Sequence, residues 1–476
     1  MPLYYSSKPR RRWKWALLFL FGLLLCFGMA GWQAHSAARP KLPPLAQDPT
    51  IQVYFNQSQA SVYREPYRSI TRYGDNLEQI LIDGIGQAHS TVDVAVQEFN
   101  LPLLAQALSQ QAKAGVRVRV ILENNYAKPW SERNPETLKE RDRNKYDEFL
   151  ALADQNRNGR LSPKEIQAGD ALKILQAARI PIIDDTADGS KGSGLMHHKF
   201  VIIDRQQVMT GSANFTTSGI HGDALNQQSR GNANVLLNIA SPALAERYQQ
   251  EFDTLWGDGP GKSDDSLFGL QKPHRGSQSV LMASGPVQVQ FAPTSKREAW
   301  SSSVSGLISQ TLAASQRSVD LALFVFSEQS ISNQLQQRHQ QGVQVRSLID
   351  PSFIYRSYSE GLDMLGLSLP DHRCQYESSN QPWATPILDV GMPKLATGDK
   401  LHHKFALIDD VTVIVGSANW SKAANRNNDE NVLVITNPLV AAHFRREFDR
   451  LYDQAEVGIT SKLDTQMAKQ LKDCRQ

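Results

Sequence analysis

The sequence repeats itself once, and this duplication constrains the fold more than any other feature. Residues 90–95, Ser-Thr-Val-Asp-Val-Ala, correspond to residues 317–322, Arg-Ser-Val-Asp-Leu-Ala. Residues 115–119 and 342–346 correspond to each other with the same offset. The repeat is far longer than the roughly 20–50 residues of a solenoid unit, and it therefore indicates a duplicated domain.

Each half alternates strand and helix patterns. In the first half, Val92–Val96 is a short apolar strand and Leu101–Lys113 has helical periodicity. Val116–Leu122 is the next strand, rich in β-branched residues as buried strands are. Strand, helix and strand in succession imply a parallel sheet with right-handed crossovers. We therefore expect an α/β sandwich in each half, with pseudo-twofold symmetry between the halves.

The repeat also sets the expected domain boundaries. Residues 51–256 should form the first domain and residues 286–460 the second. Residues 257–285, rich in Gly, Ser and charge without a clear period, are predicted to be a linker. Residues 461–476 are predicted to be a tail.

One polar signature occurs once in each half, with identical spacing, inside an apolar hairpin. Its pattern is His-x-Lys, four residues, Asp, six residues, Gly-Ser-x-Asn. Its members are His197, Lys199, Asp204, Ser212 and Asn214 in the first half and His402, Lys404, Asp409, Ser417 and Asn419 in the second. Residues two apart on a strand share a face, so the His and the Lys of each copy should point the same way.

The hairpin register decides which residues lie opposite the His and the Lys. If residues 204–207 form a four-residue loop, Lys199 lies opposite Ser212 and His197 opposite Asn214. The same count applies to the second half. On that register, one patch presents an imidazole, an ammonium, a hydroxyl and an amide.

This set of groups suits a phosphate ester. Lysine supplies charge to non-bridging oxygens, and serine or asparagine supplies neutral donors. Imidazole can act as a nucleophile or as a general acid. Cleavage of a phosphodiester needs both a nucleophile and an acid for the leaving group, and two copies of the signature provide two imidazoles. The sequence therefore predicts a single active site shared by the halves.

The signature resembles that of the phospholipase D superfamily, and the duplication covers roughly residues 51–455. The resemblance implies a covalent phosphohistidine, released by water or by a second alcohol, and chemistry without a metal. It implies that His197 is the nucleophile and His402 the acid. Four residues, Lys199, Lys404, Asn214 and Asn419, would hold phosphate oxygens, and the two Asp residues would be structural residues of the turn.

Members of that superfamily often have an acidic residue after the Asn that orients a motif histidine. Glu430 fits this description in the second half. The first half places Ala233 where Glu430 would fall, so Asp223 substitutes or the partner is absent. Which histidine attacks therefore stays open. His198 and His403 should face the other side of their strands, where a hydrogen-bonded packing role is favoured over a metal site.

The first half contains extra residues between Gly115 and His197, in a predicted insertion at about residues 140–175. Residues 154–165 match the twelve-residue loop of an EF-hand, with Gly159 at the sixth position. The predicted Ca²⁺ ligands are Asp154, Asn156, Asn158, Arg160 and Glu165. Two carboxylates predict weak affinity, with a Kd of about 10⁻⁴–10⁻³ M.

The N-terminus predicts a membrane anchor. Five basic residues precede an apolar run from Trp15 to Trp32, which would form about 27 Å of helix, close to the thickness of a bilayer core. We expect residues 1–14 in the cytoplasm, residues 15–33 as a transmembrane helix and residues 34–50 as a stiff Pro-rich spacer. The catalytic body would then lie outside the cytoplasm. A cleaved signal peptide is the alternative, with a secreted product.

Export would permit a disulfide between Cys374 and Cys474, although two unpaired thiols are the equal alternative.

The leading functional hypothesis is a phospholipid-cleaving phosphodiesterase held close to its membrane substrate. A nuclease is the first alternative, although the body of the chain is close to neutral, and affinity for nucleic acid depends on phosphate neutralisation. A cardiolipin synthase-like phosphatidyl transferase is the next. A Ca²⁺-dependent membrane-binding pseudoenzyme is the non-enzyme alternative, and the intact His and Lys of both copies disfavour it.

Overall fold

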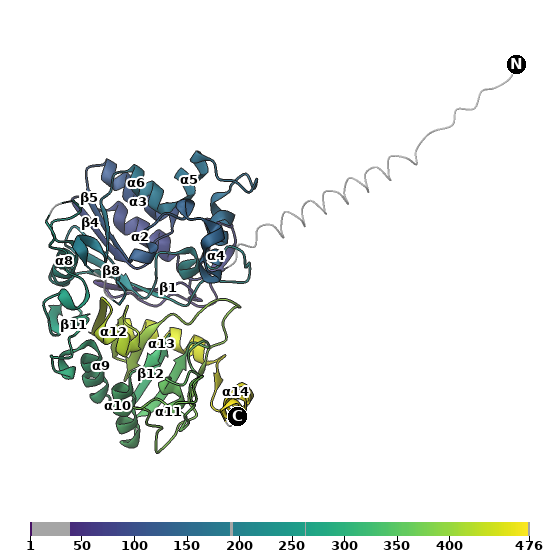
Figure 1. Cartoon of the computed structure of the whole chain (residues 1–476), viewed down its shortest axis with the longest axis vertical. Coiled ribbons are helices and arrows are strands. Elements are labelled where there is room, and N and C mark those ends of the chain that lie inside the picture. The colour runs from purple at the N-terminus through teal and green to yellow at the C-terminus, as the bar shows by residue number, and fades with distance from the viewer. Residues whose placement is uncertain (2–38, 191–193, 262, 475–476) are drawn as a thin grey trace.

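The computed structural model describes residue 1 and residues 39–190, 194–261 and 263–474. Figure 1 shows two halves, one above the other, each built around its own sheet. The first sheet has the strand order β1-β9-β8-β7-β4-β5-β6. Its strands are β1 (Ile51–Phe55), β4 (Thr91–Val96), β5 (Arg117–Leu122), β6 (Ile182–Asp184), β7 (Lys199–Ile203), β8 (Gln207–Gly211) and β9 (Val235–Ala240).

The second sheet repeats this order and adds a strand at each edge, giving β10-β11-β19-β17-β16-β12-β14-β15-β20. Its strands are β10 (Gln278–Met282), β11 (Gly285–Ala292), β12 (Ser318–Leu323), β14 (Gln344–Ile349), β15 (Val390–Met392), β16 (Lys404–Ile408), β17 (Thr412–Gly416), β19 (Glu430–Thr436) and β20 (Glu456–Val457). The prediction of two α/β halves is confirmed. The sheets are mixed rather than parallel, because the motif hairpins β7–β8 and β16–β17 and the strands beside them run antiparallel.

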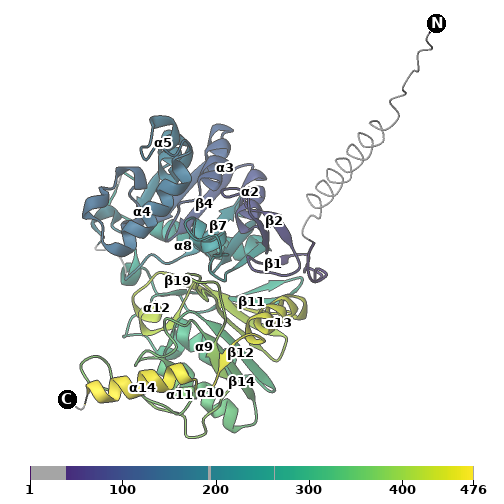
Figure 2. The ribbon, with the colours of Figure 1, turned by 90° about the vertical axis from the view of Figure 1, so that its right-hand side faces the viewer.

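Helices cover both faces of each sheet (Figures 1 and 2). One apolar cluster packs α2 (Leu77–Gly86), α3 (Pro102–Lys113) and α6 (Ala171–Ala177) against the first sheet. A second does the same for α9 (Val304–Ala313) and α10 (Gln329–Gln340) on the second sheet.

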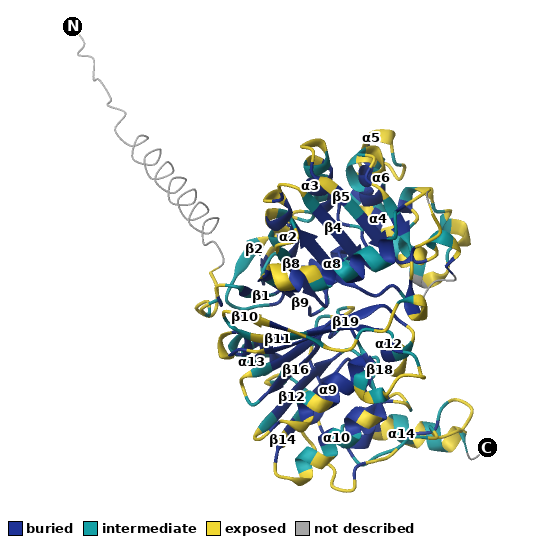
Figure 3. Ribbon diagram, turned by 90° about the vertical axis from the view of Figure 1, so that its left-hand side faces the viewer, coloured by how far each residue is buried: buried dark blue, intermediate teal, exposed yellow. Residues whose placement is uncertain are grey.

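The largest cluster joins the two halves. It combines residues of α8 (Pro242–Trp256) and α13 (Pro438–Tyr452) with the facing sides of both sheets. Phe200 and Phe405, the residues that follow the two motif lysines, are fully buried in it. Figure 3 shows buried strands, in dark blue, on both sides of the boundary between the halves. The motif strands therefore lie at the centre of the molecule.

The predicted hairpin register is wrong by one residue in both halves. Ile203 pairs with Gln207, and Ile408 pairs with Thr412. The loop is shorter than predicted because Asp204 and Arg205 both adopt positive φ angles, of 51° and 55°, which tighten the turn. Ser212 and Asn214 are consequently not directly opposite Lys199 and His197.

The remaining helices and short elements complete the two halves. The insertion contributes α4 (Glu140–Ala153) and α5 (Pro163–Gly169). The other short elements are β2 (Val62–Arg64), β3 (Thr71–Tyr73), α7 (Thr217–Ile220), β13 (Phe326–Ser327), α11 (Glu360–Met364), β18 (Trp420–Ser421) and α12 (Lys422–Arg426), with 3-10 turns at 124–126, 130–132, 135–137, 187–189, 269–271 and 300–302.

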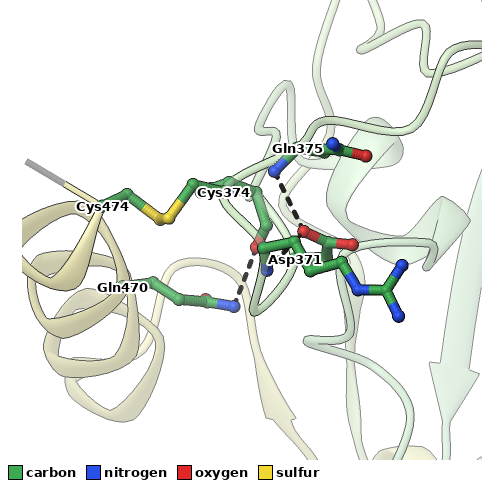
Figure 4. The surroundings of a disulfide bond; sticks show 7 residues. Asp371, Cys374, Gln375, Gln470 and Cys474 are labelled. Carbon is green, nitrogen blue, oxygen red and sulfur yellow. Dashed lines mark hydrogen bonds between the residues drawn. A yellow bond between two sulfur atoms is a disulfide. The ribbon is translucent and has the colours of Figure 1, made fainter.

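The predicted linker and tail are both ordered against the body. β10 lies within the linker range and pairs with β11, and the linker residue Phe268 is 1% exposed in the central cluster. The tail forms α14 (Ser461–Asp473), which Cys474 ties to Cys374 through a disulfide with an S–S distance of 2.11 Å (Figure 4). The pairing that the sequence left open is therefore present in the structure.

The predicted membrane anchor, residues 15–33, lies outside the described residues. Among the described residues, no helix combines the length and apolarity needed to cross a bilayer. The described part of the Pro-rich spacer lies against the body instead of standing clear of it. Arg446 donates to the carbonyl of Pro43 at 2.7 Å, and Lys41 donates its amide to the carbonyl of Gln59 at 2.9 Å. Arg446 thus satisfies a carbonyl of the spacer, and the spacer amide of Lys41 satisfies a carbonyl of the body.

Candidate active site

The backbone of each motif histidine is held by the opposite half. His197 donates its amide to the carbonyl of Asp429 at 3.0 Å. His402 donates its amide to the carbonyl of Ala233 at 3.1 Å. Because each half contributes one histidine and one anchoring segment, the two signatures meet at the interface between the halves.

The His197 side chain has a carboxylate partner from the second half. Its Nδ1 lies 2.7 Å from Oε2 of Glu430, the first residue of β19. Ser417 donates its hydroxyl to the same oxygen at 2.7 Å. Both histidine and carboxylate are buried. With Nδ1–H directed at the carboxylate, the lone pair of Nε2 is available for attack.

The His402 side chain has an amide partner in the equivalent place. Its Nδ1 lies 3.0 Å from Oδ1 of Asn234, and Ser212 donates its hydroxyl to that oxygen at 2.8 Å. The prediction of Ala233 at the position of Glu430, with Asp223 as the substitute or no partner at all, is therefore wrong. Asn234 occupies this position, whereas Asp223 accepts a bond from the amide of Leu225 within its own loop.

Both lysines are almost completely buried, at 1% exposure each. Lys199 donates to the carbonyl of His197 at 2.7 Å, and Lys404 to that of His402 at 2.8 Å. Burial lowers the pKa of Lys199 to about 7. Burial, and after it the charge of Lys199, lowers the pKa of Lys404 well below its usual range. An anion bound between the two lysines would favour their charged ammonium forms.

Burial also dominates the pKa shifts of the other titratable groups of the site, Glu430 and the two motif histidines. Burial raises the pKa of Glu430 to about 7, against the opposing charge of Lys199. Burial, followed by the charges of Lys199 and Lys404, holds the pKa of His197 and of His402 well below the ordinary value. Burial and the two lysine charges therefore favour the neutral form of both imidazoles.

The motif asparagines and the motif serines differ in their hydrogen bonding and in their place in the site. The side-chain carbonyl oxygens of Asn214 and Asn419 are buried and have no hydrogen-bond partner within the described part of the chain. The Nδ2 of Asn214 donates to Gln97 at 3.4 Å. Ser212 and Ser417 instead lie behind the site and hold Asn234 and Glu430, so we assign them a positioning role rather than the phosphate contact that the register suggested.

The two half-sites also differ in a residue that the motif does not contain. Gln97 follows β4 and lies within 3.5 Å of the Lys199 ammonium. Phe324 follows β12 at the equivalent point, its ring 4.9 Å from that of His402 and 5.0 Å from the Lys404 ammonium. One side of the site is therefore polar and the other aromatic. The pattern of the repeat could have identified this difference, because both residues occupy the same repeat position.

The other predicted residues lie away from the reacting groups. Asp204 and Asp409 are at the far ends of their strands, where each accepts amide bonds from the segment before β4 or β12. Although burial alone would raise it, these amides lower the pKa of Asp204 to about 2. His198 and His403 face the opposite side of their strands, 3.1 Å from Glu251 and 2.9 Å from Glu447.

The inserted loop lies between α4 and α5. Asp154 accepts from the amides of Asn158 and Gly159, at 3.2 and 2.7 Å. Glu165 closes the loop, since it accepts from the amide of Asn156 at 3.2 Å and from that of Ser162 at 2.9 Å. Asn156 and Asn158 cap local turns, and Arg160 donates its amide to Asn158. No cluster of three or more His, Cys, Asp or Glu suited to a metal occurs among the described residues, so Ca²⁺ stays a prediction.

Comparison with known proteins agrees with this geometry. A family model described as "Cardiolipin synthase, PLD-like domain" matches residues 81–256 and 308–452. Mitochondrial cardiolipin hydrolase of Homo sapiens is 32% identical over 147 residues, covering 30% of this chain and 49% of that protein. The protein of the same name from Chlamydomonas reinhardtii is 28% identical over 142 residues, covering 30% and 54%. The chain thus spans about half the length of the curated relatives it matches.

The fold also resembles that of a solved structure over nearly the whole chain. A phosphatidylserine synthase of Haemophilus influenzae Rd KW20 has a TM-score of 0.52, with 91% of this chain and 96% of that chain covered at 12% identity. This likeness supports the duplicated fold alone.

Proposed function

The chain belongs to the PLD-like domain family, and on that premise we propose that it is a phosphodiesterase that cleaves phospholipids through a phosphohistidine intermediate. The observation that carries the proposal is the pair of motif histidines, each anchored by the other half and flanked by a buried lysine. Two imidazoles and two ammonium groups supply the nucleophile, the acid and the anion site that diester cleavage requires.

The unequal partners assign the two roles. In this proposal Nε2 of His197 attacks phosphorus, because Glu430 at Nδ1 stabilises the positive charge that the imidazole acquires. His402 protonates the leaving alcohol oxygen as the P–O bond breaks. Binding of the anionic phosphate between the lysines raises the pKa of His402, so the acid form is present when it is needed. Water then attacks phosphorus, gives its proton to His402 and frees His197.

Phospholipid is the preferred substrate class because the curated relatives are cardiolipin hydrolases and one side of the site is aromatic. Transfer to an alcohol in place of water is the second candidate, supported by the cardiolipin synthase description of the matching family. A nuclease is the third.

Activity on matched substrates separates the three. The purified full chain should release the head-group alcohol from cardiolipin or phosphatidylcholine vesicles, and faster than it cleaves single- or double-stranded DNA. Faster cleavage of either DNA would make the nuclease the correct assignment. Product that carries an added glycerol in place of water would identify a transferase.

We further propose that the loop at residues 154–165 binds Ca²⁺ weakly. Its support is the spacing of oxygen-bearing side chains and the closing position of Glu165. Calorimetry should give a millimolar-range Kd that Glu165→Gln abolishes, while EDTA leaves the chemistry measurable. The absence of heat at millimolar Ca²⁺ would refute this site.

Export of the catalytic body is likewise a proposal. The Cys374–Cys474 disulfide supports it, since disulfides persist in oxidising compartments. In intact spheroplasts, a reporter at the N-terminus should be protected from added protease and one at the C-terminus digested. Protection of the C-terminal reporter would reverse the topology.

A further inference from the structure

A buried lysine from the linker lies behind the proposed nucleophile. Lys272 follows the short turn at residues 269–271, and its side chain is 5% exposed. The ammonium lies 2.7 Å from Oδ1 of Asp429, donates to the carbonyl of Ala292 at 2.8 Å and forms an ion pair with Glu251. Asp429 and Glu251 are 0% and 1% exposed. Lys272 is therefore a buried cation that two buried carboxylates share, and Glu251 has Arg275 as a second cationic partner at 2.9 Å.

Asp429 connects this lysine to the active site in two ways. Its carbonyl accepts the amide of His197 at 3.0 Å, and its amide donates to Leu195 at 2.9 Å. It also precedes Glu430, whose carboxylate holds the His197 imidazole. The linker adds a further contact, because the amide of Gly269 donates to the Asp429 carboxylate at 3.0 Å. The backbone and the imidazole of His197 thus both depend on the position of residues 429–430.

The other half-site has no such arrangement. The residue whose carbonyl holds the His402 amide is Ala233, which carries no charge. Behind the second hairpin, His403 contacts Glu447, and Arg450 neutralises Glu447 at 2.7 Å. Within the part of the chain that the structure describes, no lysine takes part in that network. Among the described residues, an ion pair to the residue whose carbonyl holds the histidine amide is therefore found only on the His197 side.

We propose that Lys272 is a positioning residue of the catalytic site, which acts through Asp429 to hold His197 and Glu430 in the geometry for attack on phosphorus. The inference rests on the proposed function, because it takes His197 as the nucleophile. It gives the linker a role in catalysis beyond the connection of the two halves.

The charges that face His197 make the proposal measurable. They are Glu430 on β19, Lys199 on β7 and Lys404 on β16, together with the titratable His198 and His402. Loss of the Lys272 cation leaves Asp429 uncompensated, and an added negative charge raises the pKa of the His197–Glu430 pair. Loss of the Asp429 charge does the opposite. A purely structural role would lower thermal stability without moving a pH limb in either direction.

The experiment compares four variants of the full chain by single-turnover formation of the histidine–phosphorus adduct from a phospholipid, as a function of pH. Lys272→Met should slow adduct formation at least tenfold at unchanged KM and move the acid limb to higher pH. Asp429→Asn should move that limb to lower pH. Lys272→Arg should restore the wild-type limb. Arg275→Met is the matched control, because Arg275 contacts Glu251 at 2.9 Å without contacting Asp429, and it should leave the limb in place.

The outcomes are distinguishable. Lys272→Met with the wild-type rate and limb would overturn the inference while leaving the proposed function intact. If Lys272→Met does not fold, the test rests on Asp429→Asn. An acid limb at the wild-type pH in Asp429→Asn would then overturn the inference. A wild-type chain that forms no adduct would overturn the proposed function itself, and the inference with it.

Discussion

Glu430 of the second half places its Oε2 2.7 Å from Nδ1 of His197 in the first half. The reciprocal contact, from Asn234 to His402 at 3.0 Å, has an amide where the first has a carboxylate. A carboxylate stabilises an imidazolium, whereas an amide only fixes the ring orientation. The two halves therefore share a fold but differ in the group that holds each motif histidine, a carboxylate for His197 and an amide for His402.

Exchange of the two partner residues should have unequal effects. Glu430→Gln should lower kcat about 100-fold or more, because the imidazolium formed on attack loses its counter-charge. Asn234→Asp should keep substantial activity and move the alkaline limb of the pH–rate profile to higher pH, since a carboxylate raises the pKa of His402. Steady-state kinetics across pH 5–10 checks both. Equal losses in the two variants would contradict the assignment of roles.

The wild-type acid limb should have an apparent pKa near 7. Burial raises the pKa of Glu430 to about 7, and below that pH its protonated carboxyl group no longer provides the counter-charge for His197. The pH dependence of kcat/KM with a soluble phosphodiester tests this. A rate that stays constant down to pH 5 would exclude Glu430 as the group that titrates.

Removal of either motif histidine should abolish turnover, because attack and protonation occur in series. His197→Ala and His402→Ala should each cost several orders of magnitude in kcat, and the double variant little more than either. Circular dichroism provides the control for folding. If both single variants kept more than a tenth of wild-type activity, the single shared site would be wrong.

Acid should destabilise the fold through the carboxylates behind the motif strands. Although burial alone would raise it, Lys272 and His198 lower the pKa of Glu251 to about 2. Although burial alone would also raise the pKa of Glu447, the charge of Arg450 lowers it to about 2. A carboxylate whose pKa is lower in the folded than in the unfolded protein stabilises the fold. Its contribution to the free energy of unfolding is complete above the pKa of the unfolded chain, about 4.5, and is lost as the pH falls towards 2. The Tm should drop across this window, and the drop should be smaller in Glu447→Gln.

Much of the fold and of the candidate site could be predicted from the sequence, and the positions that were predicted wrongly have physical causes. The paired signatures placed His197, Lys199, His402 and Lys404 together because strand periodicity and duplication are strong signals. The hairpin register was missed because two consecutive positive φ angles shorten the loop. Asn234 was missed because counting residues from the motif put the acidic position one residue early.

The packing of residues 257–285 against the body could not be predicted from the sequence. The composition of this segment has no period, so nothing in the sequence distinguishes Lys272 or Phe268 from solvated residues. Their burial depends on the docking of the two halves, which is a tertiary property. The contact of Asp429 with His197 is equally non-local, since it joins segments more than two hundred residues apart.

The most direct test of the central claim is the site of covalent attachment. The full chain is incubated with a phospholipid that carries a labelled phosphate, quenched under alkaline conditions that preserve phosphohistidine, digested and analysed by mass spectrometry. We predict that the label lies on the peptide containing His197 and accumulates further in His402→Ala if a substrate with a good leaving group is used. Label on His402 in the wild-type protein, or no labelled histidine at all while product forms, would contradict the account.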